Sequence, residues 1–233
     1  MTQHVPAITL HSALVVRSPF DASLLEKYRQ QHGQVDATWT PTTVLMKNIE
    51  NGLSCDVVIV TDSAMDSLIE DGIVDVASRK PLVISQIGLA VKAGEPKPDI
   101  STAEKLKTAL LQARSICYSI GGASGIHFKT VLKKLGIEAE VDAKASPVPQ
   151  GFTAEKLITG EASLAVQQIS ELLVVSGIEI VGPLPDEVQK STSFSIAVFS
   201  DSPNKSAGNA LIDIVTAPES KDEYHRFGLQ SRF

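Results

Sequence analysis

Short apolar runs alternate with longer amphipathic runs along the first third of the chain. Residues 5–16 predict a strand that runs into a loop, and residues 18–33 predict a helix whose Leu24, Leu25 and Tyr28 share one face. The same periodicities predict, in order, a strand at 34–40, a helix at 41–52, a strand at 55–61 and a helix at 63–72.

This order of strands and helices indicates an α/β fold with a mostly parallel sheet and helices on both of its faces. The continuous β-branched run at 55–61 is typical of a strand that is covered on both sides. Residues 103–113 predict a further helix. Ser101 or Thr102 is expected to cap it, and Glu104 stands three residues after Ser101, as a capping box requires.

The second half of the chain continues the alternation. Its weakest boundaries lie near Pro81–Gly88 and Pro185–Ser193. Extended segments are predicted at 81–94, and strands at 115–120 and 193–200. Helices are predicted at 121–136, 207–215 and 219–227. The segments at 138–146, 152–160, 162–170 and 178–185 continue the alternation of strands and helices.

If both weak boundaries are crossovers, the chain forms two lobes. Residues 1–84 and 193–233 would form the first lobe, and residues 85–192 would form a second lobe inserted into the first. The two crossing strands would then act as hinges, with a ligand cleft between the lobes.

Composition narrows the range of partners. The chain has 233 residues, of which 43% are hydrophobic, enough for a packed core without a metal or disulfide. A net charge of −6 and only 5% aromatic residues argue against nucleic acid, and the charge also argues against an anionic membrane. No apolar run reaches the roughly 18 residues of a membrane span, so no membrane insertion is expected.

The N-terminal residues lack the basic region and apolar run of a signal peptide. The chain as given is therefore expected to be cytoplasmic, or periplasmic if it is a trimmed mature form. Cys55 and Cys117 lie in apolar runs and are expected to be buried free thiols. The five histidines and two cysteines show no ligand spacing, so we expect neither a metal nor a cofactor.

Four loops rich in small and hydroxyl residues follow predicted strands. A helix N-terminus offers free N–H donors and a partial positive charge, and in an α/β sheet such loops gather at the carboxyl ends of the strands. Together they can hold an oxyanion without arginine or lysine. The four loops are His11-Ser12-Ala13, Pro41-Thr42-Thr43, Gly121-Gly122-Ala123-Ser124-Gly125 and Gln167-Gln168-Ile169-Ser170-Glu171.

Each loop also has a simpler interpretation. Thr42 or Thr43 can be an ordinary helix cap, and the loop at 121–125 can be only a tight turn. That loop lacks the Gly-Lys-Ser/Thr of a P-loop and the GxGxxG spacing of a dinucleotide site. Gln168 lies in an apolar stretch and needs hydrogen-bond partners, which either a ligand or the protein itself can supply.

The order of these segments resembles the periplasmic molybdate-binding protein family over essentially the whole chain. The resemblance is carried by Ser12-Ala13-Leu14, by the stretches 42–62 and 121–137, and by 160–172 with the following GPLPDEVQ at 182–189. It implies a type II periplasmic-binding-protein fold that binds a small oxyanion or carboxylate, such as molybdate or tungstate. It also implies an ABC permease as partner if the protein is exported.

In that family, serine hydroxyls, backbone groups and a late tyrosine hold the oxyanion. By the resemblance, the ligand-binding positions here are Ser12, one of Thr42 and Thr43, Gly122 and Ser124, one of Gln150 and Gly151, and Gln168 where the family often has tyrosine. Threonine and glutamine at these positions change the size and the donor set of the site.

The same resemblance extends to a branch that includes an aconitate isomerase. The alternative function is therefore a cofactor-independent enzyme that moves a proton and a double bond in a tricarboxylate. Such an enzyme needs a general acid or base, for which His11, His127 and Glu171 are the candidates, in that order. Arg17 is the candidate for cationic help to a trianion, and a ligand sensor without transport or catalysis is a third class.

Overall fold

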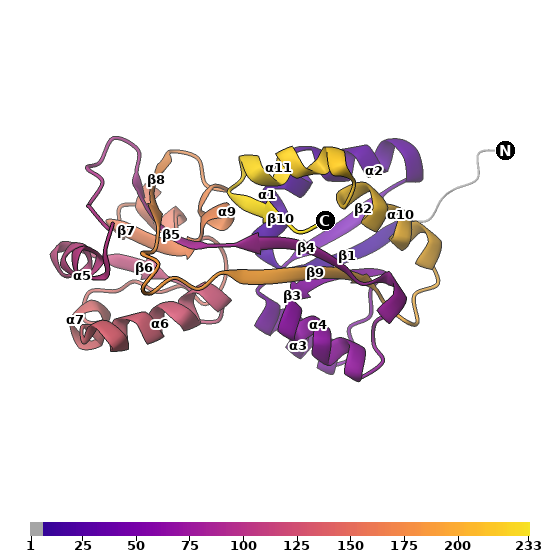
Figure 1. Ribbon diagram of the computed structural model, residues 1–233, viewed down its shortest axis with the longest axis horizontal. Coiled ribbons are helices and arrows are strands. Elements are labelled where there is room, and N and C mark those ends of the chain that lie inside the picture. The colour runs from indigo at the N-terminus through magenta and orange to yellow at the C-terminus, as the bar shows by residue number, and fades with distance from the viewer. Residues whose placement is uncertain (1–6) are drawn as a thin grey trace. The chain divides into compact units, whose positions relative to one another are not determined.

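The computed structural model describes residues 7–233, so Val5 and Pro6 of the predicted first strand lie outside the described residues. The chain divides into two compact units (Figure 1). The first contains the chain up to Ile84 together with Ser193–Phe233, and the second is Ser85–Thr192.

The first unit is built on a six-stranded sheet with the order β10-β4-β9-β3-β1-β2. β1 pairs in parallel with β2 and β3, so the carboxyl ends of these three strands share one edge, while β9 runs antiparallel to β3. The strands are β1 (Ile8–Ser12), β2 (Val35–Trp39), β3 (Val57–Thr61), β4 (Lys80–Ser85), β9 (Thr192–Val198) and β10 (Leu229–Ser231).

Helices cover both faces of this sheet. The chain leaves β1 directly into a long helical run, made of η1 (Leu14–Val16), α1 (Arg17–Pro19), a π-helical turn η2 (Phe20–Leu24) and α2 (Leu25–His32). The other helical segments of this unit are α3 (Thr42–Glu50), α4 (Asp62–Glu70), η3 (Val76–Ser78), α10 (Lys205–Val215), η4 (Pro218–Ser220) and α11 (Lys221–Arg226).

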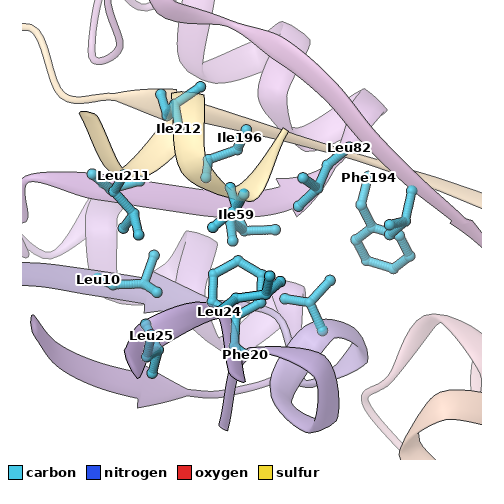
Figure 2. Close-up of a cluster of buried hydrophobic side chains, with 14 of the residues drawn as sticks. Leu10, Phe20, Leu24, Leu25, Ile59, Leu82, Phe194, Ile196, Leu211 and Ile212 are labelled. Atoms are coloured by element: carbon cyan, nitrogen blue, oxygen red, sulfur yellow. The ribbon is translucent and has the colours of Figure 1, made fainter. Parts of the chain in front are cut away.

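Two apolar cores hold these layers together. Figure 2 shows one of them, in which sheet residues such as Leu10 and Ile59 meet Leu24 and Leu211 from the helices. The other core packs α3 and α4 against the opposite face. β3 serves both cores, because Val57 and Ile59 point into one and Val58 and Val60 point into the other. The prediction of a strand covered on both sides is confirmed.

The second unit is built on a four-stranded sheet with the order β6-β7-β5-β8. β6 and β7 are parallel, and β5 runs antiparallel to β7 and β8. The strands are β5 (Ile87–Lys92), β6 (Ile116–Tyr118), β7 (Leu164–Gln168) and β8 (Ile178–Pro183), and the helices are α5 (Ala103–Gln112), α6 (Ala123–Leu135), α7 (Glu138–Asp142), α8 (Glu155–Ile158) and α9 (Ile169–Leu172).

Three expectations need correction. The sheets are more mixed than the mostly parallel arrangement, because β5 and β9 run against their neighbours. No loop follows Ser12, since a helical run begins two residues later. The capping box of Ser101 and Glu104 does not form. Thr102 is the N-cap and accepts from the N–H of Lys105 at 3.3 Å. Cys55 and Cys117 are buried free cysteines, as predicted.

Candidate functional site

The carboxyl ends of β1 and β2 bring the first two predicted loops together. Ser12 is fully buried, and its hydroxyl donates to the carbonyl of Ala13 at 2.9 Å. The N–H of Thr40 donates to the carbonyl of Ser12 at 3.0 Å, and the N–H of Ala13 donates to the carbonyl of Ile59 at 2.8 Å. These bonds fix the end of β1 between the ends of β2 and β3.

The start of α3 is not capped by a threonine. Pro41 occupies the N-cap position and no side chain caps the helix there, so the simple interpretation of Thr42 and Thr43 as caps is not supported. Thr42 is half-buried and Thr43 is exposed. Just before them, the hydroxyl of Thr40 is buried and has no hydrogen-bond partner within residues 7–233.

A third group lies at the carboxyl end of β3, and the sequence interpretation missed it. Thr61 caps α4 by accepting from the N–H of Ala64 at 3.4 Å. The next residue, Asp62, accepts from the hydroxyl of Ser195 at 2.6 Å and forms an ion pair with Arg232, at 2.8 Å between Oδ2 and Nη1. Thr-Asp-Ser after a buried strand is the same signal that identified the other loops.

In the second unit, the turn from β6 into α6 brings Gly122 and Gly125 very close to Ser119. A Cβ on Gly125 would lie 1.6 Å from the carbonyl oxygen of Ser119, and one on Gly122 would lie 2.6 Å from the Ser119 hydroxyl oxygen. Glycine is therefore required at position 125, where the contact is with backbone, whereas the Ser119 side chain could turn away from a Cβ on residue 122. Ser119 and Ser124 are both buried, and the Ser119 hydroxyl has no partner among the described residues.

The parallel pairing of β6 and β7 sets the end of β7 beside this turn. Gln167 is buried there and bridges to the preceding loop. Its Oε1 accepts from the N–H of Thr153 at 2.8 Å, and its Nε2 donates to the carbonyl of Gly151 at 3.0 Å. Gly151 is thus tied to β7, while its neighbour Gln150 is exposed.

Gln168 is buried at the end of β7. Its Nε2 donates to the hydroxyl of Thr192 at 3.4 Å, while its Oε1 is buried without a hydrogen-bond partner in the described chain. The two amide atoms of a glutamine are assigned from their contacts, and the Thr192 hydroxyl can serve either one. Gln168 can therefore offer a donor or an acceptor to a ligand.

Glu171, in α9, is a buried carboxyl group. Burial raises its pKa to about 8, although hydrogen bonds from the Gln167 side chain and the Gln168 backbone oppose that rise. The group therefore keeps its proton through neutral pH. A protonated carboxyl can donate a hydrogen bond or a proton to an anion without adding repulsion.

The other three candidates are placed differently. His127 has partners at both ring nitrogens, because Nε2 lies 2.8 Å from the carbonyl oxygen of Val188 and Nδ1 lies 3.4 Å from the hydroxyl of Thr130. His11 is half-buried and alternates with Ser12 along β1, and burial lowers its pKa. Arg17 forms an exposed ion pair with Asp21.

The described residues thus define an α/β protein of two units, each of which gathers hydroxyl, amide and backbone groups at the carboxyl ends of its parallel strands. The chain belongs to the bacterial extracellular solute-binding protein family, whose profile matches residues 8–230. The predicted two-lobed α/β fold and the resemblance to the molybdate-binding proteins are confirmed at the level of family and fold.

The chain is similar in sequence to an enzyme and in fold to anion-binding proteins. An aconitate isomerase from Pseudomonas sp. is 38% identical over 176 residues, 75% of this chain and 67% of the relative. The periplasmic molybdate-binding protein of Azotobacter vinelandii has a TM-score of 0.78 at 16% identity, covering 95% of this chain and 98% of that one. The sulfate-binding protein of Mycobacterium tuberculosis has a TM-score of 0.72 at 16% identity, covering 96% and 86%.

None of the helices between residues 7 and 233 is long and apolar enough to cross a membrane. Within the same residues, no group of three or more His, Cys, Asp or Glu side chains is arranged to hold a metal ion.

Proposed function

We propose that this protein binds a small polycarboxylate of the aconitate type and isomerises it without a cofactor. The kinship with an aconitate isomerase supports this choice of ligand. The two sheet edges supply hydroxyl, amide and backbone groups, including the buried Ser12, Ser119 and Gln168. Such neutral donors can bind an anion in a chain whose net charge is −6.

The observation that carries the catalytic part is Glu171. An isomerase of this kind removes a proton from the methylene carbon of aconitate and returns a proton to the former vinylic carbon, while the double bond moves between them. No electron acceptor is needed, because the proton count and the oxidation level are unchanged. A carboxyl group with a pKa of about 8 is ionised in a minor fraction of molecules near neutral pH. In that form the carboxylate can accept the methylene proton, and the acid so formed can return it to the former vinylic carbon.

The ligand-binding roles follow from the placement of the groups. Ser12 with Thr42 or Thr43 is the proposed ligand-binding set of the first unit. Ser124 with the N–H groups after Gly122, and Gln168, is the proposed set of the second unit. Gln150 and Gly151 would contribute only backbone or rim contacts, because Gln167 ties that loop to β7.

Turnover is measured directly by proton NMR of cis- or trans-aconitate with purified protein. Glu171→Gln keeps the size and polarity of the side chain but cannot exchange a proton, so the rate is expected to fall at least about 100-fold. Glu155→Gln is the matched control, because Glu155 is an exposed carboxylate in the first turn of α8. Absence of turnover by the wild-type protein at high enzyme concentration would remove the isomerase function.

A second function is favoured by a different observation. The four loops predicted from the sequence offer mainly neutral donors, and such donors suit a tetrahedral oxyanion such as molybdate or tungstate. In that case the protein would be a substrate-binding protein, and an exported, periplasmic form would deliver the anion to an ABC permease. Stabilisation by molybdate or tungstate, with no response to tricarboxylates, would favour this function.

A further inference from the structure

A bound tricarboxylate brings three carboxylate charges into the site, and neutral donors do not offset them. Three carboxylates in one ligand repel each other, and a cation that binds one of them offsets this repulsion. Arg17, the candidate from the sequence, forms an ion pair with Asp21. Arg232 is a second candidate, at the sheet edge of the first unit.

Hydrogen bonds fix Arg232 at the edge where the first unit gathers its polar groups. Its N–H donates to the carbonyl of Leu82 in β4 at 3.1 Å, and its Nη1 donates to the carbonyl of Phe194 in β9 at 3.2 Å. Phe194 pairs with Thr61 in the antiparallel register of β9 and β3. The guanidinium therefore lies at the carboxyl end of β3, on the edge that also carries Ser12.

Only part of the guanidinium forms hydrogen bonds with the described residues. All of its hydrogen bonds to the described residues are made by Nη1, to Phe194 and Asp62, and none is made by Nε or Nη2. The side chain keeps 24% of its surface exposed. The edge formed by Nε and Nη2 matches the two oxygens of a carboxylate, a geometry that lysine cannot reproduce.

Asp62 holds the guanidinium in this orientation. It is the first residue of α4, and its Oδ1 accepts both from Arg232 at 3.0 Å and from the buried Ser195 hydroxyl at 2.6 Å. Both bonds restrain the carboxylate, so the arginine is ordered before a ligand arrives. Such preorganisation lowers the entropic cost of binding.

We propose that Arg232 binds one carboxylate of the ligand through Nε and Nη2, with Asp62 and Ser195 as positioning residues. This proposal rests on the proposed function, because it assigns the ligand to the polycarboxylates. It adds a selectivity rule. Tricarboxylate binding depends on the arginine, whereas an anion held only by neutral donors does not.

The test is the dissociation constant of trans-aconitate, measured by titration calorimetry at fixed salt. Arg232→Gln is expected to weaken binding about 10- to 100-fold, as expected for the loss of hydrogen bonds to a charged group. Arg232→Lys is expected to recover only part of that loss. The matched control is Arg226→Gln in α11, whose exposed side chain pairs with Glu223, and its affinity should equal that of the wild type.

A double variant separates binding from stability. Arg232→Gln leaves Asp62 without its cation and can weaken the fold, whereas Asp62→Asn with Arg232→Gln removes both charges. The double variant should unfold near the wild-type temperature and still bind trans-aconitate at least about 10-fold more weakly. A folded double variant that binds within about twofold of the wild type would overturn the proposed role of Arg232 and leave the proposed function standing. A wild-type protein that binds molybdate but no tricarboxylate would overturn both this role and the proposed function.

Discussion

Several buried polar atoms at the two sheet edges have no hydrogen-bond partner within residues 7–233. They include the hydroxyls of Thr40 and Ser119 and the Oε1 of Gln168. A buried polar group without a partner costs about 1–3 kcal/mol of folding stability. In each unit these atoms lie at the strand ends of parallel pairs, where a ligand could supply the remaining partner.

Replacement of the Ser119 hydroxyl tests this interpretation. Ser119→Ala removes a buried donor without a protein partner, so the free energy of unfolding should stay equal or rise, while anion affinity should fall about 10-fold. Ser163→Ala is the contrasting variant, because its hydroxyl donates to the carbonyl of Ser115 at 2.8 Å. It should lose stability and keep affinity. Loss of stability with unchanged affinity in Ser119→Ala would contradict the assignment.

Glu171 gives stability a pH dependence of known sign. Its pKa is about 8 in the folded protein against an ordinary value of 4.5, so the folded state holds a proton that the unfolded state releases between those values. Its contribution to stability is therefore fully present below pH 4.5 and is lost as pH rises toward 8.

Glu171→Gln should remove this slope. The difference in melting temperature, variant minus wild type, should rise steadily from about pH 5 to about pH 8 and then level off. Each kcal/mol of stability that the wild type loses over this range should add about 2–4 °C to the difference. Thermal unfolding at several pH values checks this. Parallel pH curves for the two proteins would show that Glu171 does not carry a raised pKa.

At the scale of elements, the site depends on the turns by which strands enter helices. The turn from β6 into α6 is the tightest, since its glycines let the helix start approach Ser119. The resulting N–H groups of α6 have no side-chain cap, as at the start of α3. Uncapped N–H groups are available to an anion.

Gly125→Ala should disrupt this turn. Its Cβ would lie 1.6 Å from a backbone oxygen, which forces the helix start to move, with a cost of at least about 1–3 kcal/mol and a clear loss of anion affinity. Gly94→Ala is the control, since Gly94 has a φ of +83° but open space around it and should cost only about 1 kcal/mol. Equal stability and affinity of both variants would contradict the role assigned to the turn.

The elements also show which features the sequence predicts well. Glycine in the sequence predicts the helix ends at Gly33 and Gly52, and both residues have positive φ, of 104° and 93°, which glycine tolerates best. The helix start after Ser12 cannot be predicted in this way, since its residues are as apolar as the strand before it. Arg232 and Asp62 were missed because they are far apart in sequence and meet only through the sheet order β10-β4-β9-β3.

The whole molecule combines an acidic surface with binding groups that are mostly neutral. Its family membership and its fold are those of solute-binding proteins, whereas its kinship at 38% identity is with an enzyme. These facts agree if the same edges that bind an anion also hold a group that exchanges a proton with it. In the proposed function, neutral donors bind the anion, Glu171 exchanges the proton, and Arg232 gives selectivity for a carboxylate.

The most direct test of this account is thermal unfolding against trans-aconitate, cis-aconitate, citrate, molybdate, tungstate, sulfate and phosphate. A ligand at about 100 times its dissociation constant adds about 2.7 kcal/mol of stability, which is readily detected. The account predicts a clear rise in melting temperature with the tricarboxylates and a smaller one, or none, with the tetrahedral anions. A rise with molybdate or tungstate alone would contradict it.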